Sequence, residues 1–164
     1  MPATNARSSA VASAGPDELE IVEILHSPRE LTFRTWTEAK HVAEWWGPAG
    51  FTNTVCEWDA RPGGLIRIDM RAPDGTLFPM RGVFHDVIEP EWMDFTTTAF
   101  ADAEGGDQLQ VRHNVSFEDH DGKTKLTLRS RVIRTTPATE PFLDGMEADW
   151  NDSFDRLAQL LAKL

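Results

Sequence analysis

The end of the chain carries the pattern that most limits how it can fold. At 100° per residue, the large apolar side chains from residue 142 onward fall within one arc of about 120°, and most polar side chains fall outside it. The residues of this apolar stripe are Phe142, Leu143, Met146, Trp150, Phe154, Leu157, Leu160, Leu161 and Leu164. The stripe predicts one long amphipathic helix over residues 140–163, and its apolar face needs a large surface to pack against.

The middle of the chain supplies that surface as a series of predicted strands. Turn segments rich in Gly, Pro and Asp divide it into six runs, which cover approximately residues 51–60, 65–72, 77–88, 92–99, 108–118 and 123–134. Because the connections between the runs are too short for parallel crossovers, we expect an antiparallel meander.

A further strand and two short helices are predicted before this meander. The apolar residues within 18–25 indicate the strand, and the two helices follow it, the second ending at Gly47-Pro48. Residues 1–17 contain almost no large apolar side chain, so we expect a disordered leader there. Residues 18–164 then form one α+β domain, in which a curved seven-stranded antiparallel sheet wraps around the C-terminal helix. Gly64 and Gly82 are candidate positions for the bend of the sheet.

Charge and cysteine content narrow the classes of partner. The chain has 16 Lys and Arg against 27 Asp and Glu, a net charge of −11, so it would repel nucleic acid and anionic membranes. No apolar run is long enough to span a membrane, and the lone Cys56 cannot form an intramolecular disulfide. We therefore expect a cytoplasmic monomer or homodimer with neither nucleic acid nor membrane as a partner.

Several short motifs together resemble a known family. They are Ser27-Pro28-Arg29-Glu30-Leu31, Trp45-Trp46-Gly47-Pro48, Arg61-Pro62-Gly63-Gly64, Asp74-Gly75, Gly82-Val83-Phe84, and Gly145-Met146 followed by Trp150 and Leu157. In this order and spacing the sequence resembles the START-like (SRPBCC) helix-grip superfamily. Within it, the sequence is similar to the single-domain form of the family homologous to the activator of the 90-kDa heat-shock protein ATPase. The resemblance covers roughly residues 18–164.

This resemblance implies a cavity between the sheet and the terminal helix, which holds apolar molecules in many relatives. It implies no fixed cofactor and no shared catalytic residues. A heat-shock chaperone becomes a candidate partner, although the recruitment domain of the eukaryotic co-chaperones has no counterpart in these residues. Asp149 also departs from the family pattern, since relatives often carry Gly at this position.

No motif for metal binding or nucleophilic catalysis occurs in the sequence. There is no His-Glu-x-x-His, no paired Cys-x-x-Cys, no Gly-x-Ser-x-Gly and no phosphate-binding glycine loop. We therefore predict no metal site, no cofactor and no catalytic residues. His113 has the parity of the inward side chains of its strand, so it is either a hydrogen-bonded core residue or a ligand anchor or acid/base group. Ser153 lies within the helical stripe and either bonds to a preceding carbonyl or faces the cavity.

The predicted ligand-binding residues combine aromatic side chains, deformable methionines and these two polar groups. They are Trp45, Trp46, Met70, Met80, Phe84, Phe95, His113, Phe142, Met146, Trp150, Ser153 and Phe154. The alternative is that the same side chains simply fill the core.

Three functions are compatible with these observations. The leading hypothesis is that the protein binds a small, largely apolar ligand between the sheet and the C-terminal helix, as a carrier, a sensor or a sequestering protein. One alternative is a co-chaperone-like regulator of a heat-shock ATPase. The other is a cyclase or lyase-type enzyme that uses His113 as acid/base. We expect binding rather than catalysis.

Overall fold

A single antiparallel sheet and four helices make up the structure, a computed structural model that describes residues 7–15, 17–101, 104 and 106–164. In chain order the elements are β1 (Arg7–Gly15), β2 (Glu18–Leu25), α1 (Arg29–Thr35), α2 (Ala39–Trp45), β3 (Thr52–Trp58), β4 (Leu65–Arg71), β5 (Leu77–Ile88), β6 (Trp92–Ala101), β7 (Asp107–His120), β8 (Lys123–Arg134), α3 (Glu140–Asp144) and α4 (Met146–Leu161). The expected α+β class, the antiparallel meander and the two short helices after the Glu18–Leu25 strand are confirmed.

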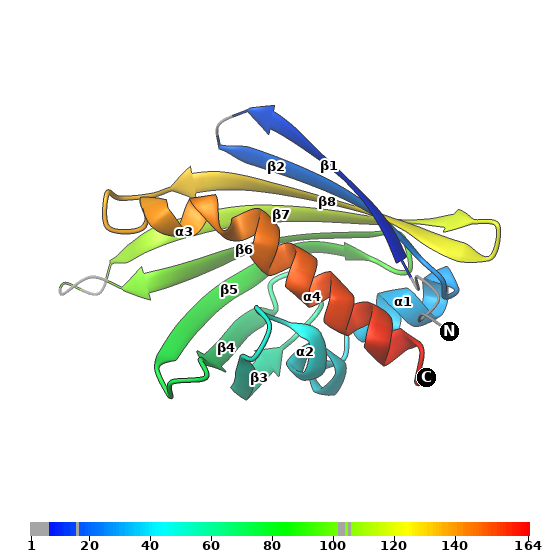
Figure 1. The fold of residues 1–164 in the computed structure, drawn as a ribbon, viewed down its shortest axis with the longest axis horizontal. Helices are drawn as coiled ribbons and strands as arrows, with labels where there is room; N and C mark the ends of the chain where they lie inside the picture. Colours follow the sequence, from blue (N-terminus) through cyan, green and yellow to red (C-terminus); the bar gives the residue numbers. More distant parts are fainter. Residues whose placement is uncertain (1–6, 16, 102–103, 105) are drawn as a thin grey trace.

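The strands form a curved sheet in the order β1-β2-β8-β7-β6-β5-β4-β3. Helix α4 lies across one face of this sheet, and α1 and α2 lie near the C-terminal half of α4 (Figure 1). Side chains alternate along each strand between this covered inner face and the outer face. The inner side chains of β5 to β8 therefore point toward α4.

The predicted number of seven strands is wrong, because the described part of the chain contains eight. The additional strand is β1, which pairs with β2 within the segment expected to be a disordered leader. Arg7 attaches β1 to the rest of the fold: its guanidinium donates to Glu23 Oε1 at 2.7 Å and to Asp155 Oδ1 at 2.9 Å. These contacts stabilise a strand that has few apolar side chains. Residues 1–6 and 16 of the predicted leader lie outside the described residues.

The single helix predicted over residues 140–163 is divided in two. Gly145 separates the five-residue α3 from α4, and α3 has no buried residue. A glycine weakens helix continuity, and α3 lacks the packing that would offset this. None of the helices in the described ranges is long and apolar enough to cross a membrane.

Both glycines that were expected to help bend the sheet are sites of close backbone approach. A Cβ at Gly82 would overlap the Thr96 carbonyl oxygen of β6, and one at Gly64 would overlap the Asp59 carbonyl oxygen. The register of β5 against β6 shifts between Phe84 and Asp86, which marks a β-bulge. Glycines and a bulge together allow this part of the sheet to curve around the helix.

The core is densely aromatic where α1, α2 and the C-terminal half of α4 meet the sheet. Trp36 is fully buried, with its ring 4.5 Å from that of Trp45 and 5.9 Å from that of Phe117. The indole N–H groups of Trp45 and Trp58 donate to the backbone carbonyls of residues 35 and 36. We call this region the closed end of the fold.

Candidate ligand-binding site

The opposite end of α4 faces a large groove. It has a volume of about 930 Å³ and lies between the inner face of β5–β7 and the segment that joins α3 to α4. We call it the outer groove. Its walls are mainly apolar and include Phe51, Met70, Phe78, Met80, Ala99, Phe100, Leu109, Val111, Phe142 and Met146.

A smaller space continues from the outer groove toward the core. This inner pocket has a volume of about 150 Å³, and Trp46, His113, Trp150 and Ser153 form its deep wall. The two spaces share the wall residues Pro48, Met70, Met80, Thr97, Val111, Met146 and Asp149. The shared wall makes them one continuous site, with the dimensions of a pocket for a small molecule.

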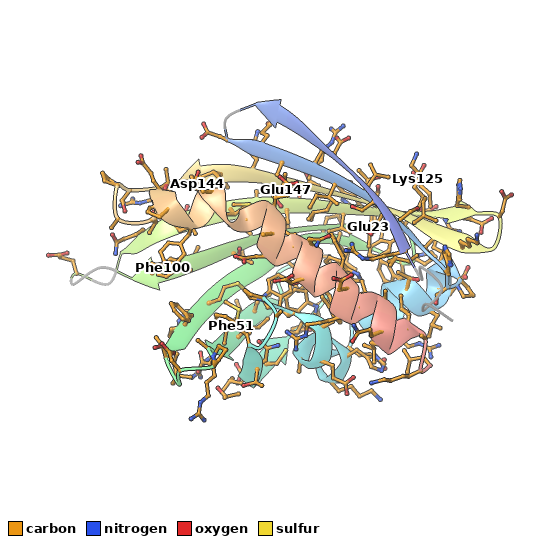
Figure 2. The ribbon with its side chains drawn as sticks, in the orientation of Figure 1. Glu23, Phe51, Phe100, Lys125, Asp144 and Glu147 are labelled. Atoms are coloured by element: carbon orange, nitrogen blue, oxygen red, sulfur yellow. The ribbon has the colours of Figure 1, made fainter. Side chains whose placement is uncertain are left out.

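Four phenylalanines edge the outer groove in a continuous series. Ring centroids lie 6.0 Å apart for Phe51 and Phe78, 6.2 Å apart for Phe78 and Phe100, and 4.2 Å apart for Phe100 and Phe142. Figure 2 places Phe100 beside α3 and Phe51 near β3 and β4. Phe100 has a φ of 58°, which is strained for a bulky residue. Its stack on Phe142 helps to hold this conformation.

His113 is the central polar group of the inner pocket. It lies on β7 opposite Ser130 of β8, and its Nδ1 is 2.8 Å from Ser130 Oγ. Its Nε2 is 3.1 Å from Oγ1 of Thr97 on β6. Burial lowers the pKa of His113 to about 3, so the ring is neutral at physiological pH. Both ring nitrogens are thus engaged by hydroxyl groups of neighbouring strands.

Ser153 joins α4 to the segment that follows α2. Its Oγ accepts a hydrogen bond from Gly47 N at 3.0 Å and donates one to Gly47 O at 3.1 Å. Gly47 has a φ of +104°, which favours glycine at this turn. Arg156 Nη1 also donates to the carbonyl of Trp46 at 3.0 Å. These bonds fix the wall of the inner pocket next to Trp46.

Asp149 stands where the outer groove meets the inner pocket. Partial burial of the carboxyl raises the pKa of Asp149, and the carboxylate of Asp152 raises it further. This carboxyl is solvent-accessible and belongs to the rim of the pocket rather than its interior.

Eight of the twelve residues predicted to bind ligand line this site: Trp46, Met70, Met80, His113, Phe142, Met146, Trp150 and Ser153. The other four, Trp45, Phe84, Phe95 and Phe154, are buried in the core and line neither space. The rings of Trp45 and Trp46 are in contact, 5.6 Å apart, but only Trp46 lines the pocket, because α2 ends between the two residues. Trp45 is the last residue of α2, whereas Trp46 has extended backbone angles and its ring faces the pocket.

Sequence reasoning missed several wall residues, among them Thr97, Val111, Phe51, Phe78 and Phe100. Thr97 and Val111 are small side chains of β6 and β7, paired directly across the two strands. Their inward parity was readable from the sequence. The three phenylalanines come together only through the strand order of the folded sheet.

Two other hollows are lined mainly by polar and charged residues. One, of about 480 Å³, contains Arg112 and Arg129, which pair with Asp94 and Glu20. The other, of about 270 Å³, contains Glu23, which pairs with Arg7. Across the residues that the structure describes, no group of three His, Cys, Asp or Glu side chains could hold a metal ion.

Comparison with known proteins identifies the fold and the family. The model of the family described as Activator of Hsp90 ATPase homolog 1-like protein matches residues 26–162. A search of curated proteins found no match.

Solved structures of bacterial proteins share the fold. One from Rhodobacter sphaeroides aligns with a TM-score of 0.80 and 18% identity over 96% of this chain and 100% of its own. One from Chromobacterium violaceum aligns with a TM-score of 0.78 and 22% identity over 90% of this chain and 98% of its own. The AHSA1 protein from Silicibacter pomeroyi aligns with a TM-score of 0.73 and 22% identity over 88% of this chain and 97% of its own. At these identities the likeness concerns the fold alone.

Proposed function

The chain belongs to the family of Activator of Hsp90 ATPase homolog 1-like proteins, and from this premise we propose that it binds a small, largely apolar molecule in the outer groove and inner pocket. The observation that carries the proposal is the continuity of the two spaces. An apolar groove of about 930 Å³ adjoins a smaller pocket whose polar groups are few and fixed by hydrogen bonds.

The arrangement of polar groups supports binding more than catalysis. The ring of His113 is neutral, and both of its nitrogens are engaged by hydroxyl groups. An acid/base group needs a pKa near the working pH and access to the substrate, and His113 lacks the first. The cyclase or lyase alternative is therefore the weaker proposal.

Thermal unfolding with neutral apolar compounds, from naphthalene to a fatty alcohol, tests the proposal. A compound present at 100 times its Kd should stabilise the protein by about 2.7 kcal/mol. Ala99→Trp provides the matched variant, because Ala99 is a small, half-buried residue of β6 in the groove wall. We expect this variant to stay within about 1 kcal/mol of the parent in stability and to bind more than about tenfold more weakly.

Ser116→Trp is the control, since Ser116 lies on the outer face of the neighbouring strand β7. Binding to this variant should match the parent. If no compound stabilises the parent protein, or if Ala99→Trp binds as well as the parent, the proposal is wrong.

Regulation of a heat-shock ATPase is a second proposal, favoured by the family description alone. Purified protein added to the chaperone should then accelerate its ATP turnover. Unchanged turnover at saturating protein would count against it. A cytoplasmic location likewise remains a prediction.

A further inference from the structure

The hydroxyl groups around His113 determine which hydrogen-bonding group the site offers to a ligand. A neutral imidazole has one N–H donor and one acceptor nitrogen, so two tautomers are available to His113. In one, Nε2–H donates to Thr97 Oγ1 and Nδ1 accepts from the Ser130 hydroxyl. In the other, Nδ1–H donates to Ser130 Oγ and Nε2 accepts from the Thr97 hydroxyl.

Ser130 distinguishes the two tautomers. Its side chain is 2% exposed, and among the described residues its Oγ has no hydrogen-bond partner other than His113 Nδ1. In the Nδ1–H tautomer the Ser130 hydroxyl proton would be buried without an acceptor. An unsatisfied buried donor is costly, so the Nε2–H tautomer is the stable one.

The consequence appears at Thr97. In the Nε2–H tautomer its oxygen accepts from His113, which leaves its own proton free to donate. Thr97 is 7% exposed and lines both the inner pocket and the outer groove. Within the described part of the chain, His113 is its only side-chain partner. The O–H group of Thr97 is therefore available to donate a hydrogen bond into the cavity.

The other hydroxyl of the inner pocket is already occupied. Ser153 Oγ donates its single proton to Gly47 O. Trp46 and Trp150 line the same space, and their rings lie 5.3 Å apart in an edge-to-face arrangement. Among the described residues of the inner pocket, Thr97 is thus the hydroxyl group whose proton remains for a ligand.

We infer that the site selects apolar molecules that carry one hydrogen-bond acceptor, such as a ketone, and that the Thr97 hydroxyl donates to this acceptor. His113 is a positioning residue: it accepts nothing from the ligand but holds the Thr97 oxygen so that its proton points outward. This inference rests on the proposed function and adds the chemical class of the ligand.

Two naphthalene derivatives of nearly equal shape test it. 2-Acetylnaphthalene carries a carbonyl group, and 2-isopropenylnaphthalene replaces the carbonyl oxygen with a CH₂ group that cannot accept. The measured quantity is the ratio of their Kd values in the parent and in Thr97→Val, which has the same shape but no hydroxyl. Comparing ratios cancels the difference in hydrophobicity between the compounds.

We expect Thr97→Val to shift this ratio about 5- to 10-fold against the ketone, the value of one net hydrogen bond. Thr97→Ser should restore the preference, because it keeps the hydroxyl. The ¹⁵N spectrum of His113 should show a protonated Nε2 and an unprotonated Nδ1 in both the free and the ketone-bound protein.

The outcomes separate this inference from the proposed function. If neither compound binds the parent, the proposed function fails for this class and the inference fails with it. If both compounds bind but the ratio is the same in Thr97→Val, the cavity stands and the inference is overturned. A protonated Nδ1 with an unprotonated Nε2 in the ketone-bound protein would also overturn it.

Discussion

The two ends of helix α4 face the same sheet, yet one end is filled and the other is hollow. At the closed end, Phe154 and Leu157 are fully buried, with the ring of Trp36 6.4 Å from that of Phe154. At the open end, Met146 is half-buried, and the sheet opposite presents the small side chains of Thr97, Ala99 and Val111. An apolar helical stripe therefore does not guarantee a filled core. The size of the facing strand residues decides whether a cavity remains.

The largest expected effect comes from truncating one aromatic side chain at each end. Phe154→Ala should lower the free energy of unfolding by about 3–5 kcal/mol, because it leaves a cavity among packed rings. Phe142→Ala should cost less than about 1 kcal/mol, because Phe142 is 43% exposed at the groove. Urea unfolding of both variants measures the difference. Equal losses would contradict the division into a closed and an open end.

A second effect concerns His113, which lies in the buried wall between the two ends. The pKa of His113 is about 3 in the folded protein against a reference value of 6.5, so only the unfolded chain gains a proton between these values. Above pH 6.5 the titration of His113 leaves the free energy of unfolding unchanged. Below pH 6.5 it lowers the free energy of unfolding by up to about 1.4 kcal/mol per pH unit.

His113→Gln removes this pH dependence. The free energy of unfolding of the variant minus that of the parent should therefore be about 3 kcal/mol larger at pH 4 than at pH 7. Unfolding curves at both pH values for the two proteins give the comparison. A difference between variant and parent that does not change with pH would show that His113 is accessible and protonated in the fold.

The smallest effect is expected at the rim of the groove. The pKa of Asp149 is raised in the folded protein, so its ionisation disfavours folding as the pH rises through its folded pKa. The free energy of unfolding of Asp149→Asn minus that of the parent should therefore be a few tenths of a kcal/mol larger at pH 7 than at pH 4. The effect is small because the carboxyl is exposed and screened by solvent. Paired unfolding curves would reveal this, and a relative loss at pH 7 would contradict it.

The sequence allowed most of the fold to be predicted because local patterns specify it. The helical stripe located α4, and turn chemistry separated the strands of the meander. β1 was missed because its stabilisation is non-local: it depends on pairing with β2 and on Arg7, which reaches Glu23 and Asp155. Neither contact leaves a signal within residues 7–15.

The candidate site was only partly predictable, for a different reason. Residues on the helical stripe, such as Met146 and Trp150, could be assigned to a buried face. Whether that face meets filled or empty space depends on the strands opposite. Phe84 and Phe95 were expected in the cavity, but their rings lie 5.3 Å apart within the core. The strand register that places small residues opposite the open end emerges only in three dimensions.

Methyl-group NMR during titration with 2-isopropenylnaphthalene tests the central claim most directly, because methyl groups report from both ends of α4 at once. At saturation, the methyl signals of Met80, Val111 and Met146 should shift, and those of Leu126, Leu128 and Leu157 at the closed end should stay in place. Shifts concentrated at the closed-end leucines, or no shifts at any of these residues, would contradict the account.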